Sequence, residues 1–160
     1  MKKACFIIPY FGRFPNYFPL WLNSAKYNSE FDFYFLTDII LTSQFSPPDN
    51  VFFVTMSKDD IITRIKATLG IEPMLLDAYK LCDFRPAYGV LFPEIIKKYP
   101  FWGYIDIDMI FGDLSLFLKD EIFNQYDKIG KQGHLTLFRN CDKCNNLFMT
   151  DSNGKYVDYF

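Results

Sequence analysis

Histidine and cysteine are scarce in this sequence of 160 residues, which contains one histidine, His134, and four cysteines. The cysteines (Cys5, Cys82, Cys141 and Cys144) lack the spacing of a disulfide framework, which favours a reducing compartment. Cys141 and Cys144 have the spacing of half a zinc site, but no second pair of ligands accompanies them, so structural zinc is disfavoured. We therefore expect two reduced, partly exposed thiols in a loop at these two positions.

Long hydrophobic runs and an excess of charge of one sign are also absent. Every apolar run is broken by Asp, Lys or Pro well before the about 18 residues that a bilayer crossing requires. Pro9 and Arg13 cut short the first apolar stretch, which argues against a secretory signal. The 17 basic and 19 acidic residues are well mixed, so nothing favours nucleic-acid binding. We expect a soluble, cytoplasmic protein, with peripheral membrane contact left open.

Hydrophobic residues make up half of the sequence, with 19 Phe and 11 Tyr, which is ample for one core in a single domain spanning residues 1–160. Short apolar segments alternate with helical patterns. We expect strands at 4–8, 31–37, 51–55, 101–107 and 134–139, and helices at 17–27, 57–70, 78–98 (interrupted at Pro86 and Pro93) and 119–126. This alternation predicts an α/β fold with a mostly parallel central sheet flanked by helices.

Ligands of parallel sheets bind beyond the carboxyl ends of the strands, which directs attention to Asp106 and Asp108 at the end of the 101–107 strand. Alternation sends both carboxylates to one side if the strand stays extended. They would repel each other unless a cation such as Mn²⁺ or Mg²⁺ neutralised them and kept positions open for phosphate oxygens. Asp-x-Asp also occurs by chance, and such aspartates cap helices or bind loop amides.

Residues 79–89 provide an upstream companion to this pair, since they contain Lys80, Asp83 and Arg85. Together with residues 7–12 and 101–114, this segment resembles the retaining GT-A glycosyltransferases, namely glycogenin-type enzymes and bacterial glycosyltransferases of polysaccharide gene clusters. The resemblance implies a GT-A-like (Rossmann-like) nucleotide-diphospho-sugar transferase fold. It also implies metal-dependent transfer of a hexose from a nucleotide-sugar, with a UDP-sugar favoured, to a saccharide or glycolipid acceptor.

The same resemblance implies roles for residues after the first two strands. Pro9, Tyr10 and Phe11 would line the pocket for the base and the ribose, and Asp38 would contact the nucleoside. For Tyr10 and Phe11, packing into the core is the alternative interpretation and the commoner role of such a pair in so aromatic a chain.

Further roles are implied for the acidic and basic residues. Lys80 would meet the charge of the diphosphate, Asp83 and Arg85 would address the donor sugar or ribose, and Lys80 with Asp83 would be the catalytic candidates. Asp106 would contact ribose and metal, and Asp108 would bind the metal. Lys80 and Asp83 are also compatible with a solvated surface pair, and Arg85 with an ordinary ion pair to a carboxylate.

The sequence departs from these enzymes at its C-terminal end, because they continue well beyond this length and commonly supply a late histidine as a third metal ligand. We expect the acceptor-binding part to be short or missing. His134, within an expected strand, does not match that late ligand and is interpreted as structural. Trp102 is expected in the core, and Asp113 is expected to cap the following helix.

Two other functions stay open. The first is a glycosyltransferase-like module that binds a nucleotide or a partner without turnover, which the short C-terminal part favours. The second is a phosphatase similar to the haloacid dehalogenases, because residues 105–110 resemble its nucleophile strand. That motif normally opens the chain, whereas about a hundred residues precede it here.

Overall fold

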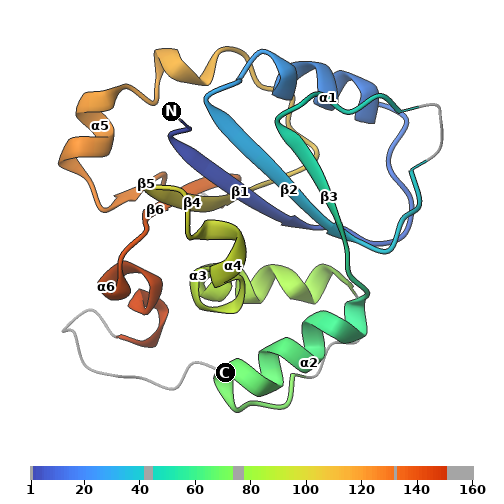
Figure 1. Ribbon diagram of the computed structural model, residues 1–160, viewed down its shortest axis with the longest axis vertical. Coiled ribbons are helices and arrows are strands. Elements are labelled where there is room, and N and C mark those ends of the chain that lie inside the picture. The colour runs from blue at the N-terminus through green and yellow to red at the C-terminus, as the bar shows by residue number, and fades with distance from the viewer. Residues whose placement is uncertain (1, 42–44, 74–77, 132, 151–160) are drawn as a thin grey trace.

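Six strands form one mixed sheet in the computed structural model, which describes residues 2–41, 45–73, 78–131 and 133–150. The strands are β1 (Ala4–Pro9), β2 (Phe31–Thr37), β3 (Val51–Thr55), β4 (Phe101–Ile105), β5 (Lys128–Ile129) and β6 (Leu135–Arg139). Their order across the sheet is β3-β2-β1-β4-β6-β5 (Figure 1). Strands β1 to β4 run parallel, whereas β6 is antiparallel to β4 and β5 is antiparallel to β6.

The prediction of an α/β protein with helices flanking its sheet is confirmed, but the sheet is mixed because its β6-β5 edge is antiparallel. Strand β5 has two residues and was not predicted, since so short a segment shows no periodicity. Strand β4 ends at Ile105, two residues earlier than expected, and β6 begins at Leu135 rather than at His134.

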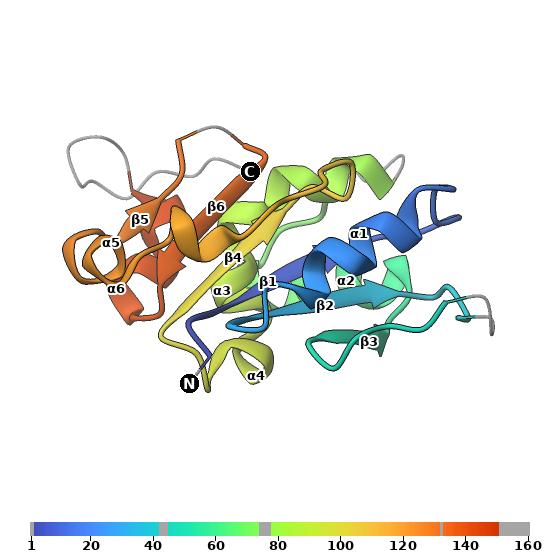
Figure 2. The same ribbon diagram turned by 90° about the horizontal axis from the view of Figure 1, so that it is seen from above.

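Helices cover both faces of the sheet (Figures 1 and 2). One face carries α1 (Phe18–Lys26), the 3-10 helix η2 (Leu114–Leu116) and α5 (Asp120–Gln125). The other face carries α2 (Lys58–Leu69), η1 (Ala78–Ala87), α3 (Tyr88–Leu91), α4 (Pro93–Ile96), α6 (Asp142–Asn145) and η3 (Leu147–Met149). In the described part of the chain, no helix has the length and apolar character needed to cross a membrane.

Side chains of the central strands alternate between two hydrophobic cores. Ala4, Phe6 and Ile8 of β1 belong to the core beneath α1, whereas Cys5 and Ile7 belong to the core on the opposite face. Because both faces are covered, the parallel strands read as nearly continuous apolar runs in the sequence.

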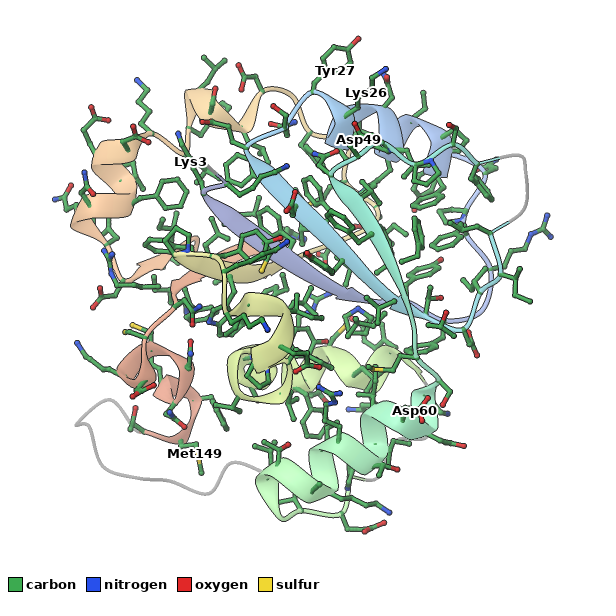
Figure 3. The ribbon with its side chains drawn as sticks, viewed as in Figure 1. Lys3, Lys26, Tyr27, Asp49, Asp60 and Met149 are labelled. Atoms are coloured by element: carbon green, nitrogen blue, oxygen red, sulfur yellow. The ribbon has the colours of Figure 1, made fainter. Side chains whose placement is uncertain are left out.

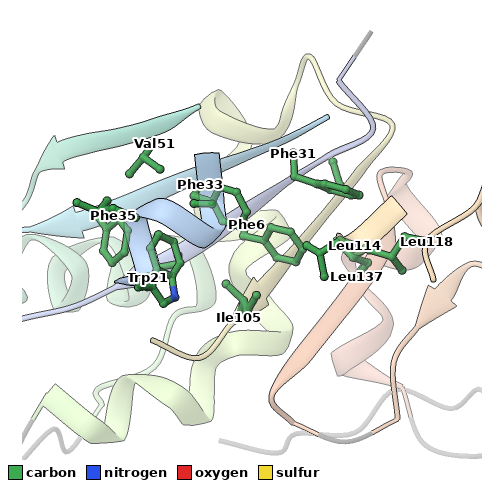
Figure 4. Close-up of a cluster of buried hydrophobic side chains, with 14 of the residues drawn as sticks. Phe6, Trp21, Phe31, Phe33, Phe35, Val51, Ile105, Leu114, Leu118 and Leu137 are labelled. Carbon is green, nitrogen blue, oxygen red and sulfur yellow. The ribbon is translucent and has the colours of Figure 1, made fainter. Parts of the chain in front are cut away.

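Aromatic rings dominate the core beneath α1 (Figure 4). Trp21 packs edge-on against Phe33 and Phe35, with ring centroids 5.3 and 5.1 Å apart, an arrangement that aromatic pairs favour. In the opposite core, Trp102 is fully buried and stacks on Phe138, which confirms its predicted place. The two cores together hold the sheet that carries the site.

The ends of α2 and the start of η2 carry local capping interactions. Ser57 forms a capping box with Asp60 at the start of α2, and Gly70 ends that helix in the left-handed conformation, at φ 70°. The Asp113 carboxylate accepts hydrogen bonds from the Ser115 amide at 2.9 Å and from its hydroxyl at 2.6 Å, so it caps η2 as expected.

The region predicted as one interrupted helix at 78–98 is a 3-10 helix followed by two short α-helices. Its first ten residues form the 3-10 helix η1, which continues through Pro86. The break lies at Phe92, whose backbone (φ −129°, ψ 52°) leaves the helical region, and Pro93 then begins α4.

Strand β4 lies unusually close to β6 at Gly103. A Cβ atom added at Gly103 would lie 1.9 Å from the backbone oxygen of Thr136 and 3.0 Å from Leu137 Cα, so no side chain fits between the two backbones. At this contact the two strands pair antiparallel, in the register that places Gly103 opposite Leu137 and Ile105 opposite Leu135.

We expect Gly103→Ala to lower the free energy of unfolding by about 3 kcal/mol or more, because the backbones must separate to admit a methyl group. Urea unfolding followed by circular dichroism measures this. Gly112→Ala is the matched control, since an added Cβ there meets nothing within 4 Å, and its stability should change by no more than about 0.5 kcal/mol. Equal unfolding midpoints for the two variants would contradict the close approach at Gly103.

Candidate functional site

A pocket of about 520 Å³ opens at the carboxyl ends of β1 and β4. Residues that follow β1, one side of η1, the segment after β4 and the residue before β6 line it. Six of the site residues expected from the sequence are among them: Pro9, Tyr10, Phe11, Arg85, Asp106 and Asp108. The carboxyl ends of parallel strands are where α/β sheets bind ligands, so the pocket has the expected place in the fold.

The helix η1 presents one of its sides to this pocket. A 3-10 helix has three residues per turn, so side chains at i, i+3 and i+6 lie above one another. Tyr79, Cys82 and Arg85 have this spacing, and all three line the pocket. Tyr79 and Cys82 were not among the site residues expected from the sequence.

Lys80 and Asp83 lie on the neighbouring side of η1 and do not line the pocket. The Lys80 ammonium lies 3.3 Å from the Asp83 carboxylate, and the two side chains are 55% and 62% exposed. They therefore form a solvated pair, and their catalytic roles stay predictions. Asp38 is exposed directly after β2 and is likewise not among the lining residues.

The β4–β6 ladder brings Asp106 and His134 together. Beyond the last strand pair, the Asp106 amide donates a hydrogen bond to the His134 carbonyl at 2.9 Å. Their side chains then meet, with His134 Nδ1 3.0 Å from Asp106 Oδ2. His134 was interpreted as structural, but it is 72% exposed and lines the pocket. Only the antiparallel register reveals this, because the two residues are far apart in sequence.

Arg85 holds the other oxygen of the same carboxylate. Its Nη2 donates to Asp106 Oδ1 at 2.6 Å, its Nη1 lies 3.4 Å from the Gly133 carbonyl oxygen, and its guanidinium lies over the Tyr104 ring at 5.2 Å. Although burial disfavours the charged form, Cys82 and Asp106 raise the pKa of Arg85 above its ordinary value. The positive charge that Asp106 requires is thus supplied by the protein.

Asp106 and Asp108 share the pocket for a reason other than the one expected. Alternation along an extended strand does not apply, because β4 ends at Ile105 and the chain turns at residues 107–108. Asp106 is partly buried and Asp108 is exposed. The turn, rather than the strand, keeps the second carboxylate at the pocket.

The side chains around Asp106 and Asp108 limit the kind of metal ion that this pocket could bind. No group of three or more His, Cys, Asp or Glu side chains able to hold a metal is assembled within the described residues. Mg²⁺ and similar hard ions need only one or two carboxylates when phosphate oxygens and waters complete their coordination. Asp106 and Asp108 fit an ion that arrives with a phosphate ligand, rather than a cage built from protein alone.

Tyr10 and Phe11 follow β1 and pack against opposite faces of the sheet. The Tyr10 ring stacks on Phe14 at 5.2 Å in the core beneath α1, and its hydroxyl donates to the Arg13 carbonyl at 3.0 Å. Phe11 packs against the opposite core. Both residues also line the pocket, so packing and exposure to a ligand are compatible here.

Comparison with known proteins relates nearly the whole chain to one family, whose model matches residues 6–159. The chain belongs to a family of unknown function (DUF6625). No curated protein and no solved structure matches it. The chemistry of the pocket is therefore the basis for assigning a function.

Other features of the chain lie away from this chemistry. A larger hollow of about 670 Å³ is lined by residues that precede β2 and β3, including Ser29 and Asp49, at the end of the sheet opposite the pocket.

Cys141 and Cys144 are free thiols at α6. Cys144 is buried in a short helix, so the expectation of two partly exposed thiols in a loop is wrong for that residue.

Cys82 offers a direct probe of the charges in the pocket. Burial raises the pKa of its thiol, Arg85 opposes that rise, and Asp106 and Asp83 add to it. We expect Arg85→Gln to move the half-maximal alkylation of Cys82 by iodoacetamide to higher pH, and Asp106→Asn to move it to lower pH. Mass spectrometry of the Cys82 peptide gives the rate at each pH. A shift of the same sign in both variants would mean that accessibility, rather than charge, controls the thiol.

Proposed function

We propose that this chain is a metal-dependent glycosyltransferase of GT-A-like fold. It binds a nucleotide-sugar, preferably a UDP-sugar, in the pocket at the carboxyl ends of β1 and β4. The acceptor in this proposal is a saccharide or a glycolipid. One observation carries it: a single pocket combines two carboxylates, a guanidinium and the aromatic rings of Tyr10, Phe11 and Tyr79, from segments far apart in sequence.

The topology of the sheet supports binding of a nucleotide at this place. From β1 the chain builds outward to β2 and β3, and it then returns to form β4 on the other side of β1. The strand order therefore reverses between β1 and β4, and crevices at such reversals bind nucleotides in open α/β sheets. The pocket is lined by residues at the ends of these two strands.

The charges suit a diphosphate. Asp106 and Asp108 would hold a divalent cation, and Arg85 would pair with phosphate oxygens, which its planar fork of donors fits. A bound cation would stabilise the negative charge on the departing diphosphate. Tyr10 and Phe11, which also line the pocket, would contact the base or ribose.

Calorimetric titration with UDP tests this proposal. We expect binding in the presence of Mn²⁺ that is lost in EDTA and weakened at least about tenfold in Asp108→Asn, because that carboxylate contributes to metal binding. Asp49→Asn is the control with the same change of charge, since Asp49 lies beside Lys26 at the opposite end of the sheet (Figure 3). Failure of both UDP and GDP to bind, with or without Mn²⁺, would overturn the proposal.

A second candidate is a module that binds the nucleotide without turnover. The observation that favours it is the outward position of Lys80 and Asp83, the two residues expected to be catalytic. Turnover distinguishes the two functions.

For an active transferase, we expect release of UDP from UDP-sugars with Mn²⁺ even without acceptor, slowed about a hundredfold in Asp108→Asn because the leaving diphosphate loses its cation. A coupled UDP assay measures this release. Tight UDP binding with no release and no transfer to any tested saccharide or lipid would favour the binding module. Hydrolysis of an aryl phosphate would instead favour the phosphatase alternative.

A further inference from the structure

The pocket contains a cation, Arg85, at the carboxylate that a metal would need to bind. Arg85 Nη2 lies 2.6 Å from Asp106 Oδ1, and His134 Nδ1 lies 3.0 Å from Asp106 Oδ2, so both oxygens of this carboxylate are engaged. The Arg85 and Asp106 side chains are only 23% and 21% exposed. Asp108, by contrast, is exposed, and it forms no ion pair with any residue in the described ranges.

We propose that Arg85 is the resident counter-cation of Asp106, and that it transfers from this carboxylate to an anionic ligand when a divalent cation binds at Asp106. This inference rests on the proposed function and deepens it, because it makes Arg85 the residue that couples metal binding to nucleotide binding. Arg85 is thus a positioning residue for Asp106 in the free protein and a ligand-binding residue in the loaded one.

Electrostatics gives the reason for the exchange. The Arg85 guanidinium and a divalent metal ion would repel each other if both lay against the partly buried Asp106 carboxylate. The single negative charge of that carboxylate cannot neutralise both of them. A metal that arrives alone therefore has to displace the guanidinium without giving it a new partner. A diphosphate supplies the missing negative charge, so metal and diphosphate together can satisfy both Asp106 and Arg85.

The contacts of Arg85 allow this movement without loss of the side chain from the pocket. The guanidinium has five N–H donors, and only its Nη2 contacts Asp106. The Tyr104 ring beneath it and the Gly133 carbonyl beside it are contacts independent of the carboxylate. The guanidinium can therefore reorient toward a ligand while it stays stacked on Tyr104.

Reciprocity of binding free energies then predicts that metal and nucleotide strengthen each other's binding through Arg85. Removal of the guanidinium should strengthen binding of the metal alone and weaken binding of the nucleotide with metal. These opposite signs separate the exchange from a merely structural role, in which both affinities would fall together.

The first experiment measures Mn²⁺ binding without nucleotide, from the electron paramagnetic resonance signal of free Mn²⁺. We expect Arg85→Gln to bind Mn²⁺ about tenfold more tightly than the wild type, a typical size for such coupling. Arg85→Lys, which keeps the charge, should stay near the wild type. Lys97→Gln removes an exposed charge far from the pocket and should also leave the affinity unchanged.

The second experiment asks whether the effect acts through Asp106. In an Asp106→Asn background, Arg85→Gln should no longer strengthen Mn²⁺ binding, because the carboxylate for which Arg85 and the metal compete has been removed. Calorimetry with UDP at saturating Mn²⁺ should show about tenfold weaker nucleotide binding by Arg85→Gln, since the guanidinium is no longer there to receive the phosphate.

An unchanged or weaker Mn²⁺ affinity in Arg85→Gln, or no Mn²⁺ binding by either protein, would overturn the exchange. A strengthening that persists in the Asp106→Asn background would overturn it as well, and so would unchanged UDP affinity in Arg85→Gln. The proposed function fails separately, if the wild type with Mn²⁺ binds neither UDP nor GDP. The Mn²⁺ titrations need no nucleotide, so the two failures can be told apart.

Discussion

The backbones of β4 and β6 approach so closely at Gly103 that no side chain fits between them, and the geometry beyond Ile105 depends on this contact. Strand β4 is paired in parallel with β1 on one side and antiparallel with β6 on the other. The end of β1, the end of β4 and the start of β6 therefore meet at one place. Residues from three distant parts of the chain line the same pocket for this reason.

The charge balance of that pocket follows from the kind of helix that precedes β4. Because η1 has three residues per turn, Arg85 faces the pocket together with Tyr79 and Cys82, while Lys80 and Asp83 face solvent. Arg85 then pairs with Asp106 and neutralises its charge. The ion pair to a carboxylate, one of the two roles left open for Arg85, is therefore the one that the structure shows, and Asp106 does not depend on an added cation for its neutralisation.

The arrangement also bears on the competing functions. A carboxylate whose two oxygens are held by Arg85 and His134 is better suited to positioning a cation or a polar ligand than to attacking phosphorus. The reversal of strand order between β1 and β4 favours a nucleotide-binding crevice. Membership in a family of unknown function neither adds to these arguments nor opposes them.

Features that depend on neighbouring residues could be predicted from the sequence. The parallel strands follow from local periodicity, and the ends of α2 at Ser57 and Gly70 follow from backbone preference. The position of Asp106 beyond Ile105, at the edge of the sheet, follows from where strand β4 ends. The direction of β6, the contact of His134 with Asp106 and the orientation of Arg85 could not be predicted in this way. They depend on which strands pair, in which register, and on the period of η1. Those are set by packing between segments far apart in the chain, which no local pattern encodes.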